Sequence, residues 1–313
     1  MSWPLIRNLP REFSFNFVGL APYAAILSAI LILASGASFV AKGLNMSIDF
    51  VGGTLLEVQT AGPPPVADLR AAVTRVGGHD AQVVTLGSEN GAMVRFRSAE
   101  DTNVVQATEK VRNELFRAFP GIKIKRAETV GAKVSGELVQ KGFFALGLAL
   151  LLMLGYIWFR FQLQFGLGAV VAVFHDVLLT LGLLSFMQLE FSMTSIAALL
   201  TVIGYSMNEK VITFDRLREN LRKYKTTPLA EVINKSENER LSRTLITGTT
   251  AILALAGALF MGGPVLFPLV FTMVFGIIIG TYSSIYVALP IILLWGVRRN
   301  DEDAAPLKPA TAR

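Results

Sequence analysis

The sequence contains no cysteine and only two histidines, and it is poor in charged residues. Without cysteine it can form no disulfide framework, no thiol nucleophile and no cysteine-ligated metal site. The two histidines, His79 and His175, belong to no cluster with the spacing of metal ligands, so we expect no metal site and no cofactor. Nucleotide-binding loops and nucleophile–base patterns are also missing, which argues against an enzyme.

The scarcity of charge is uneven along the chain and indicates a membrane protein. Charged residues make up 17% of the 313 residues, whereas a typical soluble domain has about 25%. A bilayer core of about 30 Å selects runs of roughly 20 apolar residues. We therefore predict an α-helical membrane protein with six transmembrane helices, at residues 20–40, 139–159, 165–187, 191–214, 245–262 and 266–296. The first run is too long for the apolar core of a signal peptide, which spans about 7–15 residues.

Basic residues are distributed unequally between the connecting segments. If residues 1–19, the loop near residue 160, the 215–243 loop and the tail 298–313 share one side, that side carries 15 Lys and Arg, and the opposite short loops carry none. Short cytoplasmic loops retain positive charge. We therefore predict a bacterial inner-membrane protein with both termini cytoplasmic and with a charged helical loop at 215–243. The net charge of +6 follows from this topology and requires no nucleic acid.

One long polar segment, residues 44–138, interrupts the apolar runs and is predicted to fold outside the membrane as a periplasmic domain. Alternating or β-rich patterns lie within 48–60, 81–86, 92–98 and 122–130, and amphipathic helical patterns lie at 66–77 and 103–119. This order, β-α-β-β-α-β, is typical of a small α+β ferredoxin-like domain. Such a fold names no function by itself.

Ionisable residues inside the apolar runs are the candidate functional residues, because a charge at mid-membrane costs about 2.5–3.5 kcal/mol. Asp176 lies near the middle of the third run and Glu209 in the cytoplasmic half of the fourth. Arg243 shares a helical face with Thr247 and Thr250. A carboxylate, a guanidinium and hydroxyl groups at similar depth make a candidate proton-binding site. A purely structural ion pair fits these residues equally well.

Two neighbours of these acids are ambiguous. His175, beside Asp176, could relay protons because imidazole titrates near neutrality, although an isolated histidine is more often a hydrogen-bonded packing residue. Lys210 points about 100° away from Glu209 on a helix, and we expect its side chain to extend toward the cytoplasmic boundary. Gly276 and Gly280 form a small-residue pattern that permits close helix contact.

Several segments together resemble one protein family. They are IDFVGGTLLEV (48–58), VFHDVLLTLGLLS (173–185), VIGYSMNEKVITFDRLRENLRK (202–223), INKSENERLSRTLITGTT (233–250) and FGIIIGTYSSIYVALPIIL (275–293). In this order they are similar to SecF members of the SecD/SecF family. The resemblance implies half of a resistance-nodulation-division architecture, with six spans and an external domain after the first.

The resemblance also implies a function and partners. Members of this family pair with a SecD-like subunit in the lipid bilayer, beside the SecYEG channel. They are thought to use protons moving down their gradient to help draw an unfolded, translocating polypeptide outward. The alternative is half of a proton-coupled exporter of small molecules or lipids with the same architecture. An exporter should carry a complete proton pathway and a substrate pocket in one chain or homomer, and the single acidic residue of the fourth run favours a half-unit that needs a partner.

The resemblance assigns proton use to the acidic position after Asn208 and to Arg243. At the first position the family pattern is aspartate, whereas this chain has Glu209, which keeps the titratable group but lengthens it by one methylene. The second acidic group implied by the family lies in SecD. The proton-coupling candidates are thus Glu209, Arg243 and Asp176, with Asn208, Thr247 and His175 in supporting positions.

Overall fold

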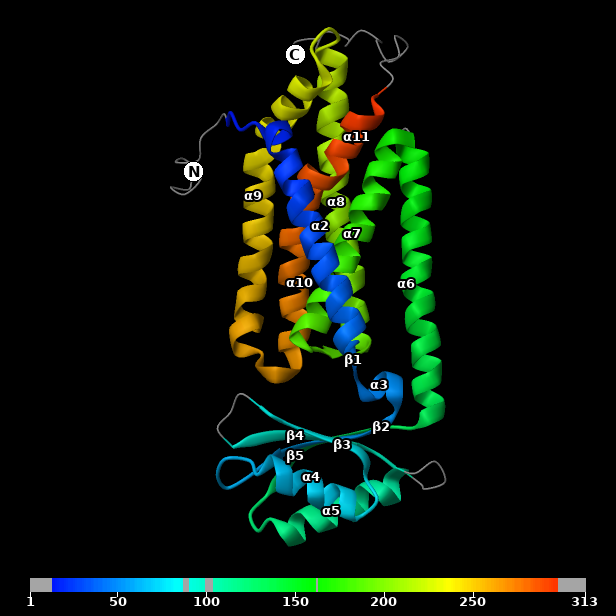
Figure 1. Cartoon of the computed structure of the whole chain (residues 1–313), viewed down its shortest axis with the longest axis vertical. Coiled ribbons are helices and arrows are strands. Elements are labelled where there is room, and N and C mark those ends of the chain that lie inside the picture. The colour runs from blue at the N-terminus through cyan, green and yellow to red at the C-terminus, as the bar shows by residue number, and fades with distance from the viewer. Residues whose placement is uncertain (1–12, 87–89, 99–103, 162, 298–313) are drawn as a thin grey trace, which may run out of the picture.

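The computed structural model describes residues 13–86, 90–98, 104–161 and 163–297 of the chain. The predicted tail 298–313 and most of the predicted segment 1–19 lie outside these residues. A long helix bundle stands over a small domain of helices and strands (Figure 1). The first and last described helices begin and end at the end of the bundle that is remote from this domain.

Five helical segments are long and apolar enough to cross a membrane: α2 (Phe17–Lys42), α6 (Ala132–Arg160), α7 (Leu163–Met187), α9 (Leu229–Met261) and the segment Leu266–Trp295. The last comprises most of α10 (Gly263–Ser283), a π-helical turn η1 (Ser284–Ala288) and α11 (Leu289–Trp295). A further long helix, α8 (Met193–Lys223), packs against α7, α9 and α10. This helix is not among the five apolar segments of the described chain.

The charged loop predicted at 215–243 consists of the ends of two bundle helices. The helix α8 extends to Lys223, and α9 begins at Leu229 directly after Pro228. Proline has a fixed φ and no N–H, so it is well suited to a helix start. Because α9 then runs without interruption to Met261, its charged first half and its apolar second half form one rigid element.

The small domain contains β2 (Gly53–Gln59), α4 (Val66–Arg75), β3 (His79–Thr85), β4 (Gly91–Arg97), α5 (Val104–Ala118) and β5 (Lys123–Val130). The strands form an antiparallel sheet in the order β3-β4-β2-β5. Both helices cover the same face of the sheet (Figure 1). Alternate strand residues and one stripe of each helix therefore form the core, which includes Leu56, Val58, Leu69, Val73, Val94, Phe96, Val111 and Leu115.

Two glycines allow the chain to turn from the bundle into this sheet. A short helix, α3 (Ile48–Val51), is followed by Gly52 and Gly53, with φ of 70° and 119°. These values are in the region that favours glycine over other residues. A Cβ atom on Gly53 would also lie 2.5 Å from the carbonyl oxygen of Phe96 on the neighbouring strand. Both positions therefore require glycine.

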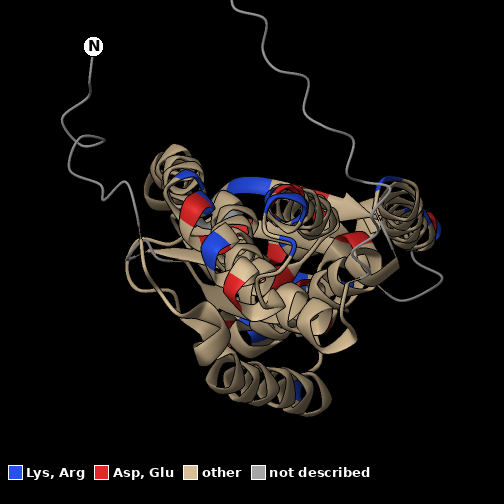
Figure 2. Cartoon of the chain, turned by 90° about the horizontal axis from the view of Figure 1, so that it is seen from above, with Lys and Arg blue, Asp and Glu red and all other residues tan. Residues whose placement is uncertain are grey.

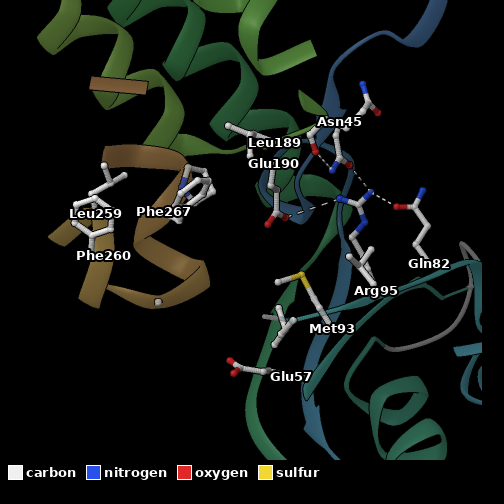
Figure 3. A pocket seen from close by; sticks show the side chains of 15 residues that line it. Asn45, Glu57, Gln82, Met93, Arg95, Leu189, Glu190, Leu259, Phe260 and Phe267 are labelled. Carbon is white, nitrogen blue, oxygen red and sulfur yellow. Dashed lines mark hydrogen bonds and ion pairs between the residues drawn. The ribbon is translucent and has the colours of Figure 1, made fainter. Parts of the chain in front are cut away.

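The small domain is attached to the bundle by a junction centred on Arg95. The short strand β1 (Asn45–Met46) follows α2, and the short strand β6 (Glu190–Phe191) follows α7. These two strands pair in parallel beneath the bundle. Arg95 of β4 donates hydrogen bonds to the carbonyl oxygen of Met46, to Asn45 Oδ1 (3.2 Å) and to Gln82 Oε1 (2.6 Å). Its guanidinium also lies 3.9 Å from the Glu190 carboxylate (Figure 3).

Burial at this junction raises the pKa of the Glu190 carboxyl above its usual value, and the nearby Arg95 opposes that shift. The junction borders a cleft of about 740 Å³ between the sheet and the turn that joins α9 to α10. Met93 of the sheet and Phe260 and Phe267 of the bundle line it (Figure 3). Arg95 thus holds the sheet against two segments of the bundle, the one that follows α2 and the one that follows α7.

Candidate functional site

The helix α8 places two ionisable side chains in the interior of the bundle at adjacent positions. The exposed fractions of Glu209 and Lys210 are 1% and 0%. Because successive helical residues point about 100° apart, the two side chains meet different neighbours. In a view along the bundle, Figure 2 shows positions of Asp and Glu (red) and of Lys and Arg (blue) among the helices.

Close packing of α10 on α8 fixes the rotation of these side chains. A Cβ atom on Gly276 would overlap Val202, and one on Gly280 would lie 3.1 Å from the Cα atom of Ser206. Small residues at a four-residue spacing allow two helix backbones to approach each other in this way. The predicted pattern at these glycines is therefore used for contact between α10 and α8.

Lys210 binds Asp176 of α7. The Lys210 ammonium lies 2.9 Å from Asp176 Oδ2, and both side chains are almost fully buried. The hydroxyls of Ser206 and Ser283 donate to the same carboxylate oxygen and accept from Lys210. Hydrogen bonds of this kind are what a buried ion pair needs to offset its desolvation.

A hydrogen-bonded chain leads from Asp176 toward α2. His175 Nδ1 lies 3.0 Å from Asp176 Oδ1, and its Nε2 lies 3.2 Å from Ser28 Oγ. Ser28 in turn contacts the Tyr282 hydroxyl at 2.9 Å, which donates to the carbonyl oxygen of Ala24. This chain joins three helices and gives His175 a structural partner on each ring nitrogen.

Glu209 faces α9, where its cationic neighbour is Arg240. The distance between Arg240 Nη1 and Glu209 Oε2 is 3.4 Å, which makes the contact a long one. The same guanidinium is held more closely by Glu237, with Nε 2.8 Å and 2.9 Å from the two carboxylate oxygens and Nη2 2.6 Å from Oε2. Two buried carboxylates therefore contact one arginine.

Hydroxyl groups complete the surroundings of Glu209 only in part. Thr244 accepts a hydrogen bond from Arg240 Nη1 (2.7 Å) and donates one to Glu209 Oε2 (3.2 Å). Ser284 accepts from Arg240 Nη2 at 3.1 Å. Glu209 Oε1 is buried and has no hydrogen-bond partner among the residues that the structure describes. Buried polar atoms are rarely left unpaired, so this oxygen marks Glu209 as the less satisfied carboxylate.

The two ionic clusters meet at the start of the π-helical turn. Ser283 is bonded to Asp176 and Lys210, whereas the next residue, Ser284, is bonded to Arg240. Single π-helical turns occur frequently at functional sites. Two pairs of adjacent residues are thus divided between the clusters: Glu209 and Lys210 on α8, and Ser283 and Ser284 where α10 continues into η1.

The structure brings together some of the residues predicted from sequence and separates others. Asp176, His175 and Glu209 are buried in the bundle, as described above. Arg243 is exposed and forms no ion pair with Glu209 or with any other part of the described chain. The expected contact between Glu209 and Arg243 is therefore corrected to Glu209–Arg240. Asn208 and Thr247 are also exposed.

The expectation for Lys210 was wrong. Its side chain does not extend toward the boundary but turns inward to Asp176, because Ser206 and Ser283 provide polar partners there. Arg240 and Glu237 were missed as site residues. Their spacing of three residues, followed by Thr244, was a detectable signal for one polar face of a helix.

Comparison with known proteins identifies a single family. The model described as "Protein export membrane protein SecD/SecF, C-terminal" matches residues 110–298, and the "SecD/SecF GG Motif" matches residues 37–64. The second match includes Gly52 and Gly53. Protein translocase subunit SecF of Rhodobacter capsulatus is 41% identical over 315 residues, covering 96% of this chain and 95% of the relative. The SecF of Rickettsia felis is 36% identical and covers 94% and 96%.

Solved structures agree with this similarity. The crystal structure of SecDF from Thermus thermophilus, a translocon-associated membrane protein, matches with a TM-score of 0.83 and 34% identity. A second SecDF structure, in the super-membrane-facing form, matches with a TM-score of 0.63. The first match covers 94% of this chain but only 40% of the SecDF chain. The chain thus spans less than half the length of the SecDF chain, but nearly the full length of these two SecF relatives.

Proposed function

Because the chain belongs to the SecD/SecF family of protein-export membrane proteins, as a SecF-type subunit of the protein translocase, we propose that it couples proton movement to polypeptide export. In this proposal it works with a SecD-like subunit beside the SecYEG channel, and Glu209 carries the proton. The observation that carries the proposal is the incomplete pairing of Glu209, which is buried with one oxygen unbonded within the described chain. Because buried polar atoms are rarely left unpaired, this oxygen is the place in the cluster where a further hydrogen-bond partner is missing.

The proposal includes a topology with α8 as the sixth span. Its ionic groups are enclosed by α7, α9 and α10, which supports a helix that crosses the membrane inside the bundle. We also propose that residues 44–138 form a ferredoxin-like domain in the periplasm, on the basis of the strand order β3-β4-β2-β5. The charged ends of α8 and α9 and both termini would then lie in the cytoplasm of a bacterial cell.

The proposed topology is tested by single cysteines, since the chain has none of its own. Thr85 of β3 and Thr226, between α8 and α9, are exposed. The strand β3 and the connection between α8 and α9 lie at opposite ends of the molecule (Figure 1). In intact spheroplasts, an impermeant thiol reagent should label Thr85→Cys and should reach Thr226→Cys only after the membrane is broken. Labelling of Thr226→Cys alone in intact spheroplasts would reverse the orientation.

The exposed face of α8 and α9 supports the proposed partner. Asn208, Arg243, Thr247 and Thr250 are exposed on these two neighbouring helices. An arginine on a lipid-facing surface near a membrane is unfavourable, and intramembrane charges usually face a protein interior or a cavity. We propose that this face is covered by the SecD-like subunit, whose carboxylate pairs with Arg243.

Affinity purification in mild detergent tests this partner directly. We expect a SecD-like chain to co-purify at a comparable amount, and we expect Arg243→Gln to reduce its recovery severalfold. Arg160→Gln is the control, because Arg160 is also an exposed arginine but is already paired with Asp215 at 3.0 Å. Recovery of the chain without any SecD-like protein, or equal losses in both variants, would contradict the proposed partnership.

A further inference from the structure

The cluster around Arg240 contains more negative than positive groups. Glu209, Glu237 and Arg240 have exposed fractions of 1%, 1% and 5%, and both carboxylates contact the same guanidinium. If all three were ionised, two negative charges and one positive charge would leave a net charge of −1 in the interior. An uncompensated buried charge is strongly unfavourable, and a buried acid usually avoids it by binding a proton.

The neighbouring groups do not remove this excess. Lys210, the nearest cation on α8, is already neutralised by Asp176 of α7. Among the described residues, the other groups beside the cluster have neutral side chains. Thr244 donates to Glu209, Ser284 accepts from Arg240, and Tyr205 and Tyr286 lie near Glu209 and Glu237. Arg243 is exposed and forms no ion pair with either carboxylate in the described part of the chain. The cation that contacts both carboxylates is therefore Arg240.

We infer that the cluster of Glu209, Glu237 and Arg240 holds one proton at rest, because Glu237 occupies Arg240 and leaves the second carboxylate without a cation of its own. Glu237 binds the guanidinium of Arg240 more closely, because both of its carboxylate oxygens lie 2.6–2.9 Å from guanidinium nitrogens. Glu209 has one contact at 3.4 Å and an unbonded oxygen among the described groups. Glu237 is thus a positioning residue for Arg240, and it makes the proton of the cluster necessary.

This arrangement couples the proton to the relative position of two helices. When the cluster loses its proton, Glu209 and Glu237 are both anions and compete for Arg240. Because Glu209 is on α8 and Glu237 is on α9, the competition draws Arg240 and α8 toward each other. The use of this movement in export rests on the proposed function, whereas the presence of the resident proton does not.

Infrared spectroscopy of the purified subunit with its partner tests the inference by counting protonated carboxyl groups. At neutral pH solvent-exposed carboxyls are ionised, so absorption by the protonated form reports the buried ones. Difference spectra between wild type and each variant remove contributions that both share. We expect Glu209→Gln and Glu237→Gln each to abolish one protonated-carboxyl band, because either change leaves one carboxylate with one arginine.

Replacing Arg240 should increase the number of protonated carboxyl groups. Arg240→Gln should raise the band to about twice its wild-type intensity, because both carboxylates then lack a cation. The double variant Glu237→Gln/Arg240→Gln should restore the single band that Glu237→Gln alone has lost. Glu237→Asp should retain the band, since it keeps the second negative charge. If Arg240→Gln does not assemble, the Glu237→Gln variant and the double variant still test the count.

Glu239→Gln is the matched control on the same helix. Glu239 is 28% exposed at its side chain and is paired with Arg216 and Asn220 outside this cluster. Its variant should leave the band unchanged. Absence of the band in the wild type, or its survival in either Glu209→Gln or Glu237→Gln, would overturn the inference. Normal export by Glu209→Gln with the expected band counts would instead refute the proposed function alone.

Discussion

Replacing Glu209 with glutamine is expected to lower gradient-dependent polypeptide export by about tenfold or more, which is equivalent to at least roughly 1.4 kcal/mol. Glutamine keeps the size and hydrogen-bonding capacity of the side chain but cannot exchange a proton. If the contact with Arg240 at 3.4 Å were only structural, an amide oxygen could still accept from that guanidinium. Loss of export with intact assembly would therefore identify protonation as the essential property.

Conservative variants of Glu209 separate the need for a titratable carboxyl group from the need for a side chain of a particular length. Glu209→Asp should retain substantial export, because aspartate is the residue that the family pattern normally has. The readout is translocation of a secreted reporter into inverted membrane vesicles, with and without a proton gradient. Arg243→Lys should be poorer than its charge suggests, because lysine lacks the planar fork that binds a carboxylate at two points. Near-normal, gradient-dependent export by Glu209→Gln would remove Glu209 from the proton path.

Removing one partner of the Asp176–Lys210 pair is expected to cause the largest loss of stability in the bundle. Lys210→Met leaves Asp176 as an uncompensated buried anion, which typically costs about 3–5 kcal/mol. The hydroxyls of Ser206 and Ser283 would remain as its only close polar partners from α8 and α10 among the described residues. We expect a marked fall in the thermal unfolding temperature of the purified protein and reduced accumulation in the membrane.

A double variant distinguishes pairing from packing in this experiment. Asp176→Asn/Lys210→Met removes both charges and should recover most of the stability lost by Lys210→Met, because a neutral pair needs no ionic compensation. The control is Arg160→Met, which breaks an exposed ion pair with Asp215 and should cost no more than about 1 kcal/mol. Equal losses in the single and double variants would show that the methylenes of Lys210 matter rather than its charge.

The gross organisation of this chain was accessible from its sequence because hydropathy and periodicity are local properties. The runs of apolar residues correspond to the helices α2, α6, α7, α9 and α10 with α11. The strand and helix patterns of the small domain appear in the predicted order, since each depends on alternation or on a helical stripe within a few residues. The first strand, Gly53–Gln59, lies within the predicted segment 48–60, whose first residues form α3 instead.

The candidate acids were also accessible, because an ionisable residue within an apolar run is visible by composition alone. Asp176 and Glu209 were both found in this way, and both are buried. Their cations were not found correctly. A shared helical face and the family resemblance favour Arg243, whereas Arg240, one turn earlier, makes the contact with Glu209.

Only the tertiary structure decided which cation meets which carboxylate. A sequence gives the spacing of side chains around one helix, but the partner of each side chain depends on how neighbouring helices are rotated and how closely they pack. Here Gly276 and Gly280 bring α10 against α8, and this approach places Ser283 at Lys210 and Ser284 at Arg240. Local pattern therefore determined the helices and the acids, and helix packing determined the two ionic clusters.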